Sequence, residues 1–202
     1  MKKTRILALA AAAALLVCLL SACGGPGPSD SGGDTAGGSG THHVTIEVQD
    51  YGTISLELDG DAAPLTVENF MNLAESGFYD GLTFHRVAAG FVIQGGQAKD
   101  ADSAPESIVG EFAANGHENS ISHVRGVISM ARATDYDSAS SQFFIMQADN
   151  TTLDGSYAAF GHVTEGMDVV DAICAEVPVN DPVWGWVDEE YQPVITKVTV
   201  ID

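Results

Sequence analysis

Basic residues are scarce in this 202-residue sequence, where eight lysines and arginines stand against 28 acidic residues and the formal net charge is −20. Nucleic-acid binding depends on lysine and arginine contacts to phosphates, so this balance excludes nucleic acid as a partner. Three of the basic residues, Lys2, Lys3 and Arg5, lie at the N-terminus, and without them the formal charge is −23. We interpret the acidic surface mainly as solubilising, although it would also repel anionic lipid and attract basic clients.

Long apolar runs are also scarce. The fifteen uncharged residues from Ile6 to Leu20 are fewer than the roughly 20 that cross a bilayer as a helix. They follow basic residues and precede Leu20-Ser21-Ala22-Cys23, an order typical of a secretory signal. We therefore expect residues 1–22 to be a signal peptide, in preference to a membrane-spanning helix.

Cysteine occurs only three times. The sequence Leu20-Ser21-Ala22-Cys23 resembles the lipobox of bacterial lipoproteins, in which the cysteine sulfur receives a diacylglycerol and cleavage leaves that cysteine at the N-terminus. By this resemblance Cys23 is the lipidation site, and acyl chains such as palmitate anchor the protein to a membrane that it does not cross. The alternative is a conventional signal peptide that leaves Cys23 as an exposed thiol. With Cys18 removed and Cys23 lipidated, Cys174 remains alone, which excludes an intrachain disulfide and predicts a buried helix thiol.

Residues 24–43 contain eight glycines and almost no apolar side chain, so they cannot form a core. We interpret residues 23–43 as the lipidated cysteine and a flexible linker, with His42 and His43 as solvated residues at its end. A linker of this length would hold the domain roughly 25 Å from its anchor on average. The folded domain is then residues 44–202.

Apolar periodicity predicts a mainly β domain. Apolar and polar residues alternate from Val44 to Leu58 on either side of Asp50-Tyr51-Gly52, which predicts a hairpin. Helical spacing predicts a helix from Ala63 to Ala74 and another from about Gly166 to Ala175. Further strands are predicted at 82–87, 91–94, 126–132, 142–147, 158–163 and 194–201. Many strands with two helices suggest a closed antiparallel β-barrel, which would leave no sheet edge unpaired.

Three motifs follow one another along this domain: the stretch from Phe84-His85-Arg86 to Gly96, then Ser141-Gln142-Phe143-Phe144-Ile145, then Leu153-Asp154-Gly155. Together they closely resemble the active-site signature of the cyclophilins, which are peptidyl-prolyl cis–trans isomerases. The resemblance runs from about Val44 to Asp202. It implies a closed eight-stranded antiparallel barrel capped by two α-helices, and an isomerase that uses no cofactor and no metal.

The same resemblance assigns roles to single residues. Rotation about an X-Pro bond crosses a barrier of about 18–20 kcal/mol because the twisted amide loses its resonance. A donor aimed at the prolyl nitrogen favours this twisted state over the planar ground states. Arg86 matches the catalytic arginine, Gln94 the glutamine that braces it, and Phe91 part of the apolar socket for the proline ring. The matching substrate-binding residues are His85, Val92, Ala131, Arg132, Gln142, Phe144, Leu153 and Tyr157.

Four positions depart from the eukaryotic members of the family. Thr152 stands in place of a tryptophan at the pocket rim, Tyr157 in place of a histidine, Arg132 in place of an asparagine, and Val92 where those members often carry a methionine. The segment around Ala131 and Arg132 would still bind the residue before proline, partly through its backbone. Because the rim tryptophan contacts cyclosporin in drug-sensitive members, we expect this chain to bind cyclosporin weakly.

Neighbouring aromatic residues need separate interpretations. Adjacent strand residues point to opposite faces, so we expect Phe143 in the core and Phe144 at the groove. For Trp184-Gly185-Trp186 we favour packing over the barrel end, with a client contact as the alternative. We assign His117, His123 and His162 to structural hydrogen bonds.

The sequence therefore predicts an isomerase that accelerates X-Pro isomerisation in proline-containing exported proteins or peptides. It would work outside the cytoplasmic membrane, lipid-anchored at the bacterial cell envelope, where isomerisation taking tens to hundreds of seconds can limit folding. The alternative is a non-catalytic proline-peptide-binding or holdase module on the same fold, and a third reading is a structural spacer. The motif residues Arg86, Phe91, Gln94 and Phe144 favour the enzyme.

Overall fold

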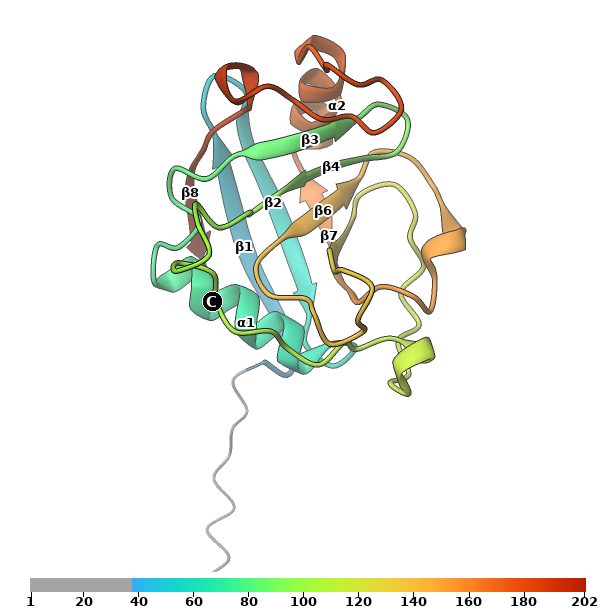
Figure 1. The fold of residues 1–202 in the computed structure, drawn as a ribbon. Helices are drawn as coiled ribbons and strands as arrows, with labels where there is room; N and C mark the ends of the chain where they lie inside the picture. The colour runs from blue at the N-terminus through green and yellow to red at the C-terminus, as the bar shows by residue number, and fades with distance from the viewer. Residues whose placement is uncertain (1–37) are drawn as a thin grey trace, which may run out of the picture. The chain divides into compact units, whose positions relative to one another are not determined.

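The computed structural model describes residues 38–202, which form an eight-stranded antiparallel sheet with two α-helices (Figure 1). The predicted signal peptide, Cys23 and most of the predicted linker lie outside the described residues. The elements are β1 (Thr41–Val48), β2 (Gly52–Asp59), α1 (Pro64–Glu75), β3 (Phe84–Ala88), β4 (Val92–Gly95), β5 (Val127–Met130), β6 (Phe143–Met146), β7 (Ala159–Glu165), α2 (Met167–Glu176) and β8 (Ile195–Val200). The strands and helices predicted from periodicity are confirmed, with ends that differ by a few residues.

The first strand begins earlier than predicted. β1 starts at Thr41, so His42 and His43 belong to the hairpin with β2 and not to the linker, although His43 stays exposed. His43 lies opposite Glu57, and its backbone N–H and its ring Nδ1 both lie 2.9 Å from Asp202 Oδ1. Apolar alternation could not predict this extension, because both faces of the strand are partly exposed at that end and carry polar residues.

The two helices are formed by the apolar residues that predicted them. Pro64 begins α1, where its missing N–H costs nothing, and Val67 and Phe70 are completely buried beneath the helix. In α2, Val170 and Ile173 are completely buried, while Cys174 is only partly buried against the core. Burial raises the pKa of the Cys174 thiol to about 11, so it stays protonated at neutral pH. No helix within residues 38–202 is both long and apolar enough to cross a membrane.

The prediction of a closed barrel is wrong. The strand order is β3-β4-β6-β5-β7-β2-β1-β8, and the curled sheet stays open between β3 and β8. The two edges are joined over a few residues, by an isolated bridge between Thr83 and Val194 and by backbone hydrogen bonds between residues 81–84 and 193–195. Pro193 has no N–H to donate to a longer ladder. The rest of the β3 edge is covered by residues 184–187, drawn in red beside β3 in Figure 1.

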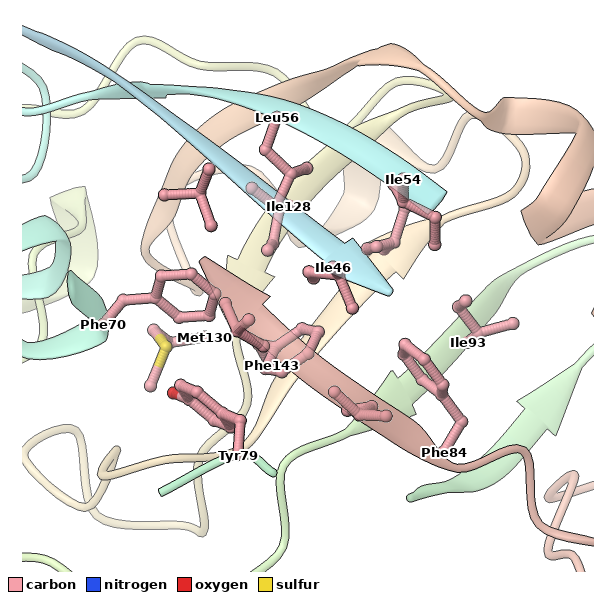
Figure 2. Close-up of a cluster of buried hydrophobic side chains, with 14 of the residues drawn as sticks. Ile46, Ile54, Leu56, Phe70, Tyr79, Phe84, Ile93, Ile128, Met130 and Phe143 are labelled. Atoms are coloured by element: carbon pink, nitrogen blue, oxygen red, sulfur yellow. The ribbon is translucent and has the colours of Figure 1, made fainter. Parts of the chain in front are cut away.

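Aliphatic and aromatic side chains together fill the inside of the curled sheet (Figure 2). Phe143 is completely buried, as predicted, and meets three other rings edge to face: Phe70 at 5.5 Å, Tyr79 at 5.6 Å and Phe84 at 5.9 Å between centroids. Such pairs contribute about 0.5–1.5 kcal/mol each beyond the area they bury. Because Phe143 points inward, its neighbour Phe144 is directed to the other face of β6.

Candidate active site

A groove of about 340 Å³ lies on the outer face of the sheet, beside β3, β4 and β6. It is lined by Arg86, Phe91, Val92, Gln94, Ala131, Arg132, Phe144, Leu153, Tyr157, Trp184 and Trp186. Nine of the eleven residues assigned from the sequence are therefore brought together, although they come from segments far apart in the chain. Gln142 lines an adjoining hollow that shares Gln94, Ala131 and Arg132 with the groove. His85 lines neither.

Arg86 is held from two sides. It lies opposite Gln94 in the β3–β4 ladder, and its Nη1 donates to Gln94 Oε1 at 3.1 Å. Its Nε donates to the carbonyl oxygen of Trp184 at 2.7 Å, and Gln94 in turn donates to Gln142 Oε1 at 3.0 Å. Burial lowers the pKa of Arg86, but a guanidinium stays charged at any physiological pH. Of its five N–H donors, these two bonds leave three for a ligand.

An apolar socket lies next to this guanidinium. Phe144 and Val92 form its buried floor, with 5% and 1% of their surfaces exposed. Phe91, Leu153 and Tyr157 pack around them, and the rings of Phe144 and Tyr157 meet edge to face at 5.8 Å. The Arg86 guanidinium lies 5.6 Å from the Phe91 ring centroid, so the socket and the cationic donor are directly adjacent.

A buried polar network supports the socket from behind. The His123 ring lies parallel to Phe144 at 6.0 Å, with its Nδ1 2.9 Å from Asp154 Oδ1 and its Nε2 3.1 Å from Ser129 Oγ. The order Asp–His–Ser is that of a hydrolase triad, but His123 and Ser129 are completely buried and no substrate can reach the hydroxyl. His123 therefore makes structural hydrogen bonds, as the sequence predicts, and fixes the position of Phe144.

Arg132 lines the groove, yet its guanidinium is largely engaged by the protein itself. It lies 4.8 Å from the ring centroids of Tyr136 and Tyr157, and 5.1 Å from that of Phe112. Its Nε and Nη1 each donate at 2.9 Å to backbone carbonyls, those of Ser156 and Ala133. Through the Tyr157 ring, Arg132 contacts the wall of the socket.

His85 lies behind the groove, so its position does not support the predicted contact with substrate. Only 7% of the residue is exposed, its ring stacks on Trp186 at 6.0 Å, and its Nδ1 has no hydrogen-bond partner. Burial, aided by the positive charge of Arg86, lowers the pKa of His85 to about 4. The imidazole is therefore neutral at pH 7.

Trp184 and Trp186 are the groove residues that sequence reasoning placed elsewhere. Both line the groove, with 60% and 47% of their surfaces exposed, so the expected packing over the barrel end is not where these side chains lie. Thr152, by contrast, does not line it, and its hydroxyl donates to Asn150 Oδ1 at 2.6 Å. Within residues 38–202 no cluster of three His, Cys, Asp or Glu side chains is placed to hold a metal ion.

Known proteins resemble this chain in both sequence and fold. A profile of the family described as "Cyclophilin type peptidyl-prolyl cis-trans isomerase/CLD" matches residues 43–200. The chain is 44% identical over 136 residues to peptidyl-prolyl cis-trans isomerase A of Dickeya dadantii, which covers 65% of this chain and 70% of that protein. It is 42% identical over 136 residues to a peptidyl-prolyl cis-trans isomerase of Acinetobacter baylyi, covering 64% of this chain and 70% of that protein.

Solved structures agree. A cyclophilin-type isomerase of Cryptosporidium parvum, crystallised in the presence of the dipeptide Ala-Pro, superposes with a TM-score of 0.68 at 25% identity, covering 79% of this chain and 99% of that one. The family profile spans nearly the whole described part of the chain, and the relatives carry the activity in their names. The chain therefore belongs to the family of cyclophilin-type peptidyl-prolyl cis–trans isomerases and is an enzyme of that class.

Proposed function

We propose that this isomerase acts on proline-containing exported proteins at the bacterial cell envelope, where a lipid on Cys23 anchors it. The support for the location is the N-terminal sequence: basic residues, an apolar run and the Leu20-Ser21-Ala22-Cys23 motif. The glycine-rich residues after Cys23 would give the domain reach beyond the membrane surface. An acidic domain held on a lipid anchor would stand away from anionic headgroups and favour neutral or basic clients.

The position of Arg86 carries the mechanistic part of the proposal. A proline ring seated against Phe144 and Leu153 places its nitrogen next to the Arg86 guanidinium. As the amide twists, the prolyl nitrogen becomes pyramidal and accepts a hydrogen bond that the planar amide cannot accept. Because Gln94 and the Trp184 carbonyl already hold the guanidinium, the donor needs no reorganisation when the lone pair appears. No bond is broken and no proton is transferred.

We also propose that cyclosporin binds this protein weakly. Thr152 offers a short hydroxyl that is already committed to Asn150, and it contributes no surface to the groove. Catalysis does not depend on this rim, because the floor of the socket is built from Val92 and Phe144.

The location is tested by replacing the cysteine that would carry the lipid. In cells labelled with a palmitate analogue, wild-type protein should be labelled and recovered with membranes. Cys23→Ser should lose both the label and the membrane association, because the cysteine sulfur that would carry the lipid is absent. Cys18→Ser, five residues upstream inside the predicted signal, is the matched control and should keep both. Wild-type protein that is unlabelled and soluble would rule out the anchor.

A further inference from the structure

Trp184 and Trp186 are exposed although large aromatic side chains are usually buried. They are the only two tryptophans in the sequence, and both line the groove beside Arg86. Neither ring donates to or accepts from the Arg86–Gln94 pair, which uses only the backbone carbonyl of Trp184. The chemistry of rotation therefore leaves both indole rings without a role.

The segment that carries these rings is ordered by its own hydrogen bonds. The Asp181 carboxylate accepts the backbone N–H of Val183 at 2.8 Å and that of Trp184 at 3.1 Å. The Gly185 N–H donates to the Asp181 carbonyl at 2.6 Å, which closes a tight turn. A side chain presented on such a turn loses little backbone freedom when it binds a ligand.

The same segment is fastened to β3. Val87 donates to the Gly185 carbonyl at 2.7 Å, and Val187 donates to the His85 carbonyl at 3.1 Å. On its inner side the Trp186 ring stacks on buried His85. The two indoles therefore stand on a fixed backbone and form an apolar wall of the groove, with their exposed surfaces available to a ligand.

The position of this wall indicates which part of a peptide it would meet. The hollow that adjoins the groove is lined by Gln94, Gln142 and residues 131–133, and it contains neither tryptophan. By the family resemblance, the segment around Ala131 and Arg132 binds the residue before proline. A peptide whose proline fills the socket and whose preceding residue lies there would leave the groove past the tryptophans with the residue that follows proline.

We propose that Trp184 and Trp186 form a subsite for a large apolar or aromatic side chain immediately after the proline. This inference rests on the proposed function, because it takes prolyl peptides as the ligand. Contact with two indole faces should favour phenylalanine over glycine at that position by about fivefold to 30-fold in affinity. The subsite would direct the enzyme to Pro-aromatic and Pro-aliphatic sequences.

Two measurements test the subsite on the full-length protein in detergent. The first is the rate of isomerisation, measured by NMR exchange on succinyl-Ala-Ala-Pro-Phe-amide and succinyl-Ala-Ala-Pro-Gly-amide. The second is intrinsic fluorescence during titration with each peptide, because both tryptophans of the chain lie in the proposed subsite. The Pro-Phe peptide should shift the emission to shorter wavelength and bind more tightly than the Pro-Gly peptide.

Variants separate recognition of the residue after proline, by the indole rings, from the support that the Trp184 carbonyl gives to Arg86. Trp184→Ala keeps the carbonyl that holds Arg86 and should reduce the ratio of kcat/KM for the Pro-Phe peptide to kcat/KM for the Pro-Gly peptide. The double variant Trp184→Ala/Trp186→Ala should bring this ratio close to one. Tyr191→Ala, which removes an exposed aromatic residue outside the groove, should leave the ratio unchanged.

A wild-type ratio near one, or a double variant that keeps the wild-type ratio, would overturn the subsite. If neither peptide is isomerised, the proposed function fails, and the fluorescence titration still decides the subsite. Tighter binding of the Pro-Phe peptide would then support it, and equal binding of the two peptides would overturn it.

Discussion

The two arginines of the groove are held by different partners, so they differ in how many N–H donors remain for a ligand. Arg86 is fixed at its Nε and at one terminal nitrogen, which leaves cationic donors directed at the groove. Arg132 donates to two backbone carbonyls and lies against three aromatic rings, so little of its donor capacity remains for a ligand. We therefore propose that electrostatic stabilisation of the twisted amide falls to Arg86, whereas Arg132 packs against Tyr157 at the socket.

At Thr152 we expect a gain in drug binding on restoring the aromatic rim. Thr152→Trp should tighten cyclosporin binding by roughly one to two and a half orders of magnitude. An added hydrogen bond contributes about 0.5–1.5 kcal/mol and the aromatic area about 1–2 kcal/mol. Inhibition titrations of wild type and variant measure the difference, with Thr151→Trp as the neighbouring control. Nanomolar inhibition of the wild type, or no gain in Thr152→Trp, would show that Thr152 does not occupy the rim position.

Residue-level predictions succeeded where a strand fixes the direction of a side chain. The alternation of Phe143 and Phe144 along β6 puts one in the core and the other in the groove, as two-residue periodicity requires. His85 and Trp186 were harder, because their placement depends on a long-range stack between β3 and a loop about 100 residues away. No local pattern distinguishes a tryptophan that packs over a sheet from one that lines a groove.

The segment from Asp181 to Val187 contacts both the edge of the sheet and the candidate active site. It covers the β3 edge that an open sheet leaves unpaired, and its Trp184 carbonyl orients Arg86. Gly185 lets the segment approach β3 so closely. Its φ is +76°, and a Cβ at this position would lie 2.5 Å from the carbonyl oxygen of Val87.

Gly185→Ala should therefore lower both stability and activity. Left-handed backbone costs an alanine about 1–2 kcal/mol, and the clash with β3 should add about 1–3 kcal/mol to the loss in unfolding free energy. Gly90→Ala is the matched control, because its φ is +78° but nothing lies within 4 Å of its Cβ position. Denaturant unfolding of both variants measures the difference. Equal losses would mean that the 181–187 segment is not pressed against β3.

The elements themselves followed from local patterns, whereas closure of the sheet did not. Alternation, short apolar runs and helical spacing predicted both helices and all eight strands, because each element carries a local apolar pattern, even where both faces of a strand are buried, as in β5 and β6. Whether the first and last strands of a sheet pair depends on residues distant in sequence. Here Pro193 and residues 184–187 lie along the β3 edge, where β8 would have to pair to close the sheet. The periodicity of β3 and β8 does not predict the position of either.

At the scale of the whole molecule, buried histidines should make stability fall in mild acid. Burial lowers the pKa of His85 to about 4 from its ordinary 6.5, and it also lowers the pKa of His123. A folded-state pKa below the unfolded value means that the unfolded state binds protons first. The stability that comes from a neutral His85 is therefore complete above about pH 6.5 and is lost as the pH falls from 6.5 to about 4.

His85→Phe isolates this effect because phenylalanine can stack on Trp186 but cannot titrate. Between pH 6.5 and 4, wild type should lose stability relative to His85→Phe with a slope approaching about 1.4 kcal/mol per pH unit, or about 2–3 kcal/mol in total. Chemical denaturation at a series of pH values measures both curves. Parallel curves would mean that His85 is already charged, or is solvated, in the folded protein.

We propose that Arg86, held by Gln94 and the Trp184 carbonyl, accelerates prolyl rotation through a hydrogen bond made mainly in the twisted state. The most direct measurement is kcat/KM for a short X-Pro peptide with wild type, Arg86→Ala and Arg125→Ala. Arg125 pairs with Asp171 on the surface and does not line the groove. Arg86→Ala should keep the wild-type circular dichroism spectrum and lose about 30-fold to 1,000-fold in rate, equivalent to about 2–4 kcal/mol, while Arg125→Ala stays within about twofold. A folded Arg86→Ala protein within about twofold of wild type would mean that Arg86 does not accelerate the rotation.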